Sequence, residues 1–417
     1  MIFYQRFWNL IKVDILEVFN CFYSGATNLQ DINTGWVCLL PKRTEAVFAT
    51  DYRPISLVHS LSKLISKVLA TRLQAFMDKL INPFQAAFIK GRSILDNFNS
   101  AHILIHHLHS SKERAALLKI DFERAFDHIN WQFLLALLKA RGFDNRWLGW
   151  IEALLHSANT AVLLNGIPGK AFTCKRGLRQ GDPLSPLLFI LCVDVFFRMI
   201  HLAVTSLSIT AVGIGNVKLH TLQFADDILL FFDGSARSAA AIKIILDTFS
   251  SNSGLRINYY KSYLTPINLP NDQAATVANS FGCSLKDFPL TYLDLPLSPK
   301  KLRRSDYMPL IEKIDNRLSG WKSLVLSRGG RLVLLNSPDP EQRACRGPMA
   351  LRPSCSRRRP RQRRRRKTAR AARDGIVAAA LLLPAPAKAT EEEDDGDDES
   401  SVGFDECCQM ERLDTSR

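Results

Sequence analysis

The sequence lacks the cysteine spacings of a metal module or a disulfide scaffold. Its nine cysteines are scattered over 417 residues, with no Cys-x-x-Cys pair and no Cys/His set at zinc-ligand spacing. It also lacks a basic start followed by an apolar stretch and a small-residue cleavage site, so we expect no secretion signal. These absences argue against a zinc-binding module and against a disulfide-rich secreted domain, and favour a nuclear or cytoplasmic protein.

Apolar runs that could cross a membrane are missing as well. The stretch 187–193 is followed by Asp194 and Arg198, and the stretch 376–387 is short and contains Pro384. The basic residues do not form one amphipathic stripe, which disfavours a protein bound to a membrane surface. We therefore expect no membrane partner.

Negative charge is in the minority. The chain has 55 Lys and Arg against 40 Asp and Glu, a net charge of +15 at pH 7. Residues 341–417 hold 17 basic and 14 acidic side chains, so the first 340 residues carry a net charge of +12. This surplus favours a polyanionic partner such as nucleic acid.

The composition changes near residue 336. Upstream, the apolar periodicity is continuous, whereas downstream a basic run at 357–367 and an acidic run at 391–399 hold like charges that repel each other. We predict that 337–417 is a disordered tail. The alternative for this segment is a shifted reading frame or a fused fragment.

Upstream of that boundary the pattern predicts a mixed α/β fold. Helices are expected in a segment that ends before Gly25, over 61–80, over 131–141, from Ser185 and Pro186 onward with Ser185 as the cap, and over 238–250 with Ser238 as the cap. Hairpins are expected over 36–57 and 161–174, and buried strands over 117–121, 222–224 and 228–232.

Carboxylates stand at the ends of these buried strands. Asp121 ends the first, and Asp226 and Asp227 lie between the other two. Clustered carboxylates repel each other and cost free energy to desolvate, so a site that keeps them needs a cation. Two Mg²⁺ ions about 3.5–4 Å apart catalyse in-line phosphoryl transfer. The simpler alternative is that Asp226 and Asp227 form only a turn and that Asp121 is a cap.

The residues around these acids narrow the interpretation of their function. Three segments, Asp121-Phe-Glu-Arg-Ala-Phe-Asp127, Arg176-Gly-Leu-Arg-Gln-Gly-Asp-Pro-Leu-Ser-Pro186 and Phe224-Ala-Asp-Asp227, stand in the order of reverse-transcriptase motifs. The chain resembles non-LTR (LINE-type) retrotransposons, most closely those common in plant genomes. The resemblance covers about residues 1–336 and includes Asp51-Tyr-Arg-Pro-Ile-Ser56, Gln85-Ala-Ala-Phe-Ile-Lys-Gly-Arg92, Gly254-Leu-Arg-Ile-Asn258 and Tyr292-Leu-Asp-Leu-Pro296.

The resemblance implies a right-hand polymerase. It places N-terminal helices and fingers in 1–115, the palm with interleaved fingers elements in 116–285, and the palm end with a truncated thumb in 286–336, before the tail 337–417. Asp294 stands where the family usually has Gly; if that position needs a positive φ, Asp tolerates it better than most residues.

The implied activity is RNA-directed DNA synthesis. A primer 3′-hydroxyl attacks the α-phosphate of a dNTP, on an RNA template with a DNA primer. Asp121 and Asp226 are implied to hold two Mg²⁺ ions, or Mn²⁺ in their place, and Asp227 completes the catalytic set. The alternative is a truncated relic that binds nucleic acid without polymerising. The oligomeric state stays open.

Nucleotide-binding roles follow from the same resemblance. Lys42 and Arg53 of the fingers hairpin are implied to contact the triphosphate, and Gln180 and Gly181 are implied to contact the incoming nucleotide. Phe126 is implied to act as a steric gate against the 2′-hydroxyl. Lys261 is implied to give a proton to pyrophosphate. The alternatives are that Lys42 and Arg53 are simply solvated cations, that the loop of Gln180 and Gly181 is a plain turn, and that Phe126 is a core aromatic. For Asp127 we favour a structural role such as a cap.

A further set of cations is implied to contact the nucleic-acid backbone: Lys63, Lys67, Arg72, Lys90, Arg92 and Arg179. The alternative for this set is a solvated face.

Overall fold

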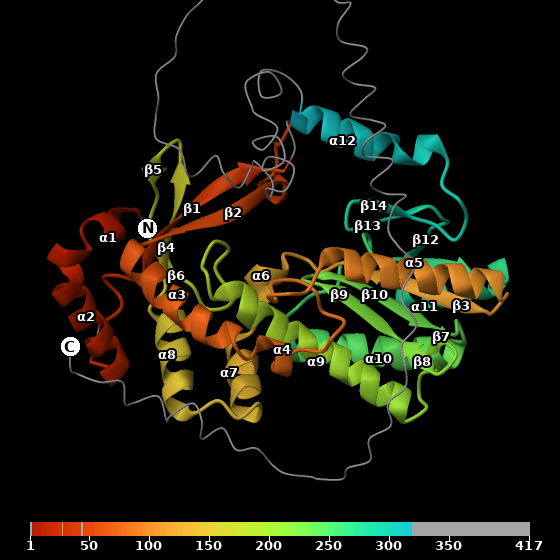
Figure 1. Ribbon diagram of the computed structural model, residues 1–417, viewed down its shortest axis with the longest axis horizontal. Coiled ribbons are helices and arrows are strands. Elements are labelled where there is room, and N and C mark those ends of the chain that lie inside the picture. Colours follow the sequence, from red (N-terminus) through yellow and green to blue (C-terminus); the bar gives the residue numbers. More distant parts are fainter. Residues whose placement is uncertain (1, 27, 43–44, 319–417) are drawn as a thin grey trace, which may run out of the picture. The chain divides into compact units, whose positions relative to one another are not determined.

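The computed structural model describes residues 2–26, 28–42 and 45–318 (Figure 1). The predicted tail 337–417 and the end of the predicted thumb lie outside the described residues.

The first half of the fold is mainly helical. Its elements are α1 (Ile2–Arg6), α2 (Trp8–Ser24), β1 (Thr34–Pro41), η1 (Ala49–Asp51), β2 (Tyr52–Val58), α3 (Ser60–Gln74), α4 (Met77–Leu80), α5 (Ile94–Ser110), β3 (Ala115–Ile120), α6 (Ala125–His128), α7 (Trp131–Ala140), α8 (Asn145–His156), β4 (Asn159–Leu164), β5 (Ile167–Pro168) and β6 (Phe172–Thr173).

The second half alternates long helices with short strands. Its elements are α9 (Ser185–Thr205), β7 (Val212–Ile214), β8 (Val217–Leu219), β9 (Thr221–Phe224), β10 (Asp227–Phe232), α10 (Ala236–Ser253), β11 (Tyr263–Ile267), α11 (Asn271–Phe281), β12 (Ser284–Leu285), β13 (Leu290–Tyr292), β14 (Leu295–Leu297), η2 (Arg304–Tyr307) and α12 (Met308–Leu318).

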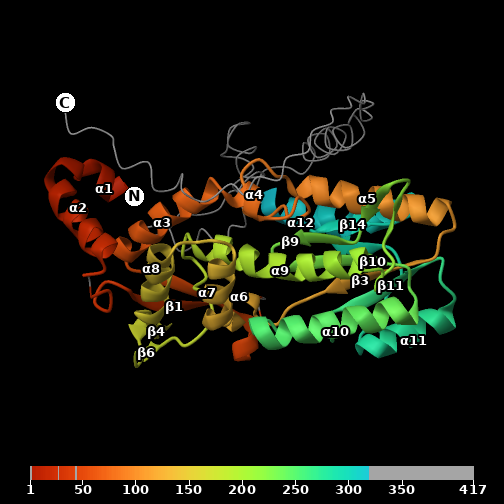
Figure 2. The same cartoon turned by 90° about the horizontal axis from the view of Figure 1, so that it is seen from below.

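A five-stranded palm sheet in the order β12-β11-β3-β10-β9 forms the centre of this fold. Successive side chains of a strand point to opposite faces, so β3 contributes to two cores. Ala116, Leu118 and Ile120 pack with residues of α9, α10 and α11, while Ala115 and Leu117 pack with residues of α5 (Figures 1 and 2). Helices therefore cover the sheet on both faces, and its strand ends are left for the site.

A second sheet, called here the fingers sheet after the expected fingers, contains β2, β1, β4, β5 and β6. β1 and β2 pair antiparallel from Gly35 opposite Val58 to Pro41 opposite Tyr52, which confirms the predicted hairpin. β4 joins β1 in parallel, and β5 and β6 both pair with β4, which confirms the hairpin expected over 161–174.

Three local expectations were wrong in detail. The helix expected over 61–80 breaks after Gln74, where the amides of Ala75 and Phe76 donate to carbonyls three residues back, so the last turn tightens. Asp182, and not Ser185, accepts from the first amides of α9. Ser235 caps α10, because the Ser238 hydroxyl instead accepts from the Thr210 amide.

The core helix α9 contains a buried acid, Asp194, that has a structural role. By length and composition α9 could cross a membrane, and 61% of its most apolar stretch is buried inside the described structure. Asp194, with 0% exposure, accepts from the guanidinium groups of Arg141 and Arg198, both at 2.7 Å, and from the amide of Asn82 at 2.9 Å. Burial opposes ionisation of Asp194, but these hydrogen bonds outweigh it and lower its pKa.

We predict that Asp194→Asn lowers the free energy of unfolding by about 3 kcal/mol at pH 7, since it leaves the mostly buried guanidinium of Arg141 without its carboxylate. Because the folded pKa lies below the ordinary 3.8, this contribution is present above that pH and is lost as the pH falls through the folded pKa. Urea unfolding of both proteins from pH 7 to pH 3 measures it. A stability difference that does not shrink in acid would contradict the assignment.

Candidate functional site

The predicted carboxylates meet at one end of the palm sheet. Ile120 of β3 lies opposite Ile228 of β10, so Asp121, which follows β3, lies at the same end as the turn that connects β9 to β10. Asp226 is in that turn and Asp227 is the first residue of β10. The register of two neighbouring strands thus brings together acids that are far apart in the sequence.

Their electrostatics reflect this proximity. Partial desolvation raises the pKa of Asp226, although the residue is exposed in the turn, and the charges of Asp227 and Asp121 raise it further. Desolvation also raises the pKa of Asp121, and Asp227 adds to that shift. Each carboxylate therefore holds its negative charge at a cost in free energy.

Lysines offset part of this charge. Lys119 Nζ lies 3.4 Å from Asp227 Oδ1, and Lys119 and Lys261 both lower the pKa of Asp121. Lys119 was not expected as a site residue from the sequence. The available signal was its position two residues before Asp121 in an apolar strand, which places both side chains on one face.

The donor chemistry at this end suits a hard divalent cation. Among the described residues, no three His, Cys, Asp or Glu side chains gather as a group that could hold a metal ion. Asp121 and Asp226 nevertheless offer two carboxylates whose mutual repulsion a cation would relieve, whereas Asp227 is engaged by Lys119. Mg²⁺ favours sites with few carboxylates, in which water and phosphate oxygens fill the remaining coordination positions.

The segment after α10 supports Asp121 through its backbone. The Asp121 amide donates to the Ser262 hydroxyl at 3.1 Å, and the Asn258 amide donates to the Asp121 carbonyl at 2.8 Å. Neither Asn258 nor Ser262 was singled out from the sequence as a site residue. The same segment carries Lys261, an exposed lysine whose charge acts on Asp121.

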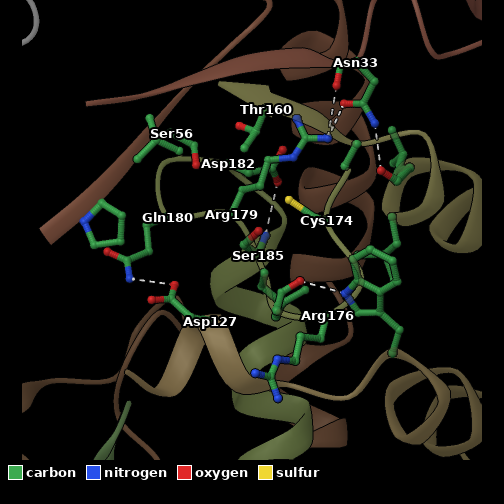
Figure 3. A pocket seen from close by; sticks show the side chains of 18 of the residues that line it. Asn33, Ser56, Asp127, Thr160, Cys174, Arg176, Arg179, Gln180, Asp182 and Ser185 are labelled. Carbon is green, nitrogen blue, oxygen red and sulfur yellow. Dashed lines mark hydrogen bonds between the residues drawn. The ribbon is translucent and has the colours of Figure 1, made fainter. Parts of the chain in front are cut away.

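A cavity of about 470 Å³ lies between the fingers sheet and the start of α9 (Figure 3). Gln180 lines it, and its side-chain amide donates to Asp127 Oδ1 at 3.4 Å. Arg124 and Asp127, which follow Asp121 in the chain, line the cavity, whereas Asp121 and Asp226 do not.

Gly181 allows the loop before α9 to lie against the fingers. The Ser56 amide of β2 donates to the Gln180 carbonyl at 2.8 Å. Gly181 has a φ of +109°, and a Cβ there would lie 2.8 Å from the Ser56 carbonyl oxygen. Gly181 therefore permits a close backbone approach to strand β2 that a residue with a Cβ would obstruct.

Phe126 and Asp127 lie on the short helix α6 beside this loop. The Phe126 ring stacks on Phe189 of α9, with centroids 4.4 Å apart and planes 14° apart. The backbone carbonyl of Phe126 accepts from the Leu178 amide at 2.6 Å, which ties α6 to the loop before α9. Asp127 was expected to act as a cap, but it lies inside α6 and its carboxylate accepts from the Gln180 side chain.

The fingers hairpin contributes clustered positive charge. Lys42 and Arg53 are both exposed, and Lys42 Nζ donates to the Thr50 carbonyl at 2.8 Å. Partial desolvation lowers the pKa of Lys42, and the charges of Lys261, Arg124 and Arg53 lower it further. These cations from separate segments therefore face a common space. Arg124, inside the first motif, is a member that sequence reasoning missed.

The six cations predicted to contact the nucleic-acid backbone fall into two groups. Lys63, Lys67 and Arg72 on α3 and Lys90 after it are exposed. The guanidinium groups of the other two bind protein, which favours a structural role for Arg92 and Arg179. Arg92 donates to Asp78 Oδ1 at 2.7 Å and to the Gln85 carbonyl at 2.7 Å, and Arg179 donates to Asn33 Oδ1 at 2.6 Å.

Asp294, which replaces the usual family Gly, adopts the positive φ that the sequence suggested, +67°. Its carboxylate pairs with Lys313 of α12 at 2.8 Å.

Comparison with known proteins gives a consistent result. The family described as Reverse transcriptase (RNA-dependent DNA polymerase) matches residues 40–279. The chain is 27% identical over 339 residues to the Transposon TX1 uncharacterized 149 kDa protein of Xenopus laevis, which covers 80% of this chain and 25% of that protein. It is 28% identical over 255 residues to the retrovirus-related Pol polyprotein from type-2 retrotransposable element R2DM of Drosophila melanogaster. This match covers 60% of this chain and 23% of that protein.

This chain thus spans about a quarter of the length of these two relatives. Among solved structures, a telomerase from Candida tropicalis in complex with a fragment of telomeric RNA aligns with a TM-score of 0.47 at 12% identity, over 73% of this chain and 52% of that chain.

We predict that Gly181→Ala lowers the free energy of unfolding by about 1–3 kcal/mol, because the new Cβ meets the Ser56 carbonyl at a positive φ. Gly149→Ala is the matched control: it lies exposed in α8 with nothing within 4 Å of a Cβ, so it should stabilise by about 0.5–1 kcal/mol. Urea denaturation measures both. Equal effects of the two substitutions would show that the loop does not depend on this close approach.

Proposed function

Because the chain belongs to the reverse transcriptase (RNA-dependent DNA polymerase) family, we propose that it extends a DNA primer on an RNA template as part of a non-LTR retrotransposon protein. The observation that carries this proposal is the meeting of Asp121 and Asp226 at one end of the palm sheet, beside the cations of the fingers. The relatives named above come from animals, so the resemblance to elements of plant genomes stays a prediction.

In this proposal Asp121 and Asp226 hold two Mg²⁺ ions, or Mn²⁺ in their place. When bound, the ions supply charge neutralisation and activation of the primer hydroxyl. The raised pKa values of both acids support the need for such a counter-charge. Asp227, held by Lys119, keeps the start of β10 in place and adds to the negative field.

The fingers cations bind the triphosphate. Lys42 and Arg53 project from the hairpin, and an arginine fork can grip two phosphate oxygens at once. Desolvation lowers the pKa of Lys42 and repulsion from neighbouring cations lowers it further, and this clustering of cations supports a site built for an anion. Lys261, whose charge acts on both Asp121 and Lys42, donates a proton to the departing pyrophosphate.

Phe126 selects deoxyribonucleotides. Stacking on Phe189 holds the Phe126 ring in a fixed position. The backbone hydrogen bond from the Leu178 amide to the Phe126 carbonyl links α6 to the loop that contains Gln180. A ribose 2′-hydroxyl would clash with the fixed ring, whereas a deoxyribose would fit.

Exposed Lys63, Lys67, Arg72 and Lys90 bind the template-primer backbone. They supply charge without base recognition, so binding should weaken steeply with salt. The same cations would remain in a relic that binds nucleic acid and does not polymerise, which is the alternative function. Nucleotide incorporation separates the two.

We predict that Asp226→Asn reduces primer extension on an RNA template below detection while the fold is kept. Because the pKa of Asp226 is raised in the folded protein, the ionised carboxylate costs stability at pH 7, so the variant should unfold at higher urea without metal. Mg²⁺ should raise the melting temperature of the wild type more than that of the variant.

Asp272→Asn, which removes an exposed acid on α11, is the control and should leave all three measurements unchanged. Primer extension by Asp226→Asn at the wild-type rate would refute the polymerase proposal. A wild type that binds the duplex and incorporates nothing would favour the relic.

A second prediction concerns sugar selection. Phe126→Ala should lower the preference for dNTP over rNTP at least about tenfold, because the wall against the 2′-hydroxyl is removed. Phe133→Ala, which removes another half-buried aromatic, from α7, should leave the preference unchanged. Single-nucleotide incorporation gives kcat/KM for both sugars, and an unchanged ratio in Phe126→Ala would exclude the gate.

A further inference from the structure

The segment between α4 and α5 pairs with the strand that leads into the acidic turn. Gln85 forms a parallel bridge with Gln223 of β9. The Gln223 amide donates to the Phe84 carbonyl at 3.0 Å, and the Ala86 amide donates to the Gln223 carbonyl at 3.1 Å. Since β9 is the edge strand of the palm sheet, this segment covers an edge that would otherwise lack partners.

The side chain of Gln85 reaches beyond the strand to the turn itself. Gln85 has 0% exposure, and its Oε1 accepts from the amides of Ala225 and Ala87, both at 3.0 Å. Two converging N–H donors require an oxygen at this position, which sets the orientation of the amide. Its Nε2 is buried without a partner among the described residues, so the oxygen carries the contact.

Ala225 is a position that needs such support. It lies directly before Asp226 and has a φ of +54°, a backbone conformation that residues with a Cβ rarely adopt. The carboxylate that follows is repelled by Asp121 and Asp227. Both strain and repulsion would move the turn away from Asp121 if nothing held its backbone.

We propose that Gln85 is a positioning residue that holds the Ala225 amide and so keeps Asp226 next to Asp121. The backbone part of this inference stands on geometry alone, and its consequence for catalysis rests on the proposed polymerase function.

The support is itself anchored in the core. Arg92 donates from Nη1 to the Gln85 carbonyl at 2.7 Å and to the Asn82 carbonyl at 2.5 Å. Asn82 Nδ2 in turn donates to Asp194 Oδ1 at 2.8 Å and to Gln223 Oε1 at 3.0 Å. The hydrogen bonds of Asp194 therefore continue through Asn82 to the segment that carries Gln85, and Arg92 has a structural task in that segment.

The first test needs no substitution. Hydrogen exchange of the full wild-type chain, without metal or nucleotide, should show the Ala225 amide protected to within about tenfold of the Phe231 amide in β10, which donates to the His220 carbonyl at 2.8 Å. An Ala225 amide that exchanges at the rate of a free turn amide would overturn the proposal.

The second test uses Gln85→Met, which keeps the length of the side chain and removes the acceptor. We expect exchange at Ala225 to quicken at least tenfold, with exchange at Phe231 unchanged. Gln273→Met, which removes the side-chain bond from α11 to the Gly234 carbonyl at 3.0 Å, is the matched control and should leave Ala225 unchanged. Equal exchange at Ala225 in Gln85→Met and wild type would overturn the contact.

Primer extension then tests the consequence. In Gln85→Met, kcat should fall at least tenfold while KM for dNTP stays within twofold, because binding groups are untouched and the acid is misplaced. An unchanged kcat despite lost protection would overturn the positioning role. A wild type that incorporates nothing would instead reject the polymerase function and leave the exchange result to decide the contact.

Discussion

The site depends on one electrostatic constraint, which is that Asp121 and Asp226 are held together although they repel each other. Adjacent strands β3 and β10 create the proximity, since their register places both acids at the same end of the palm sheet. Desolvation and like charge raise the pKa of each carboxylate, so the free protein stores unfavourable energy at this point. A divalent cation is the group that would turn that cost into binding energy.

Much of the surrounding structure either offsets this repulsion or resists it. Lys119 and Lys261 offset the charge directly. Hydrogen bonds to the backbone resist movement: Ser262 and Asn258 hold Asp121, and Gln85 holds the residue before Asp226. These contacts come from separate segments, so the geometry of the acids depends on the packing of the whole palm.

The fingers and the loop before α9 meet this acidic centre with cations and a stacked aromatic. Gly181 permits the loop to lie against β2, and Phe126 is fixed between Phe189 and that loop. A strongly negative centre faced by positive charge suits a substrate that brings both phosphates and metal ions. Membership of the reverse transcriptase family agrees with this arrangement.

The sequence by itself determined the class of fold, the two main hairpins, most helices and the identity of the central acids, because apolar periodicity and short motifs are local properties of the chain. It could not separate Arg92 and Arg179, which bind protein, from exposed Lys63 and Lys67, since all four are cations in polar stretches. Nor could it find Lys119 or Gln85 as parts of the site, or the task of Asp127. Those roles arise where segments distant in the chain come into contact, and only the tertiary structure decides which donor then meets which acceptor.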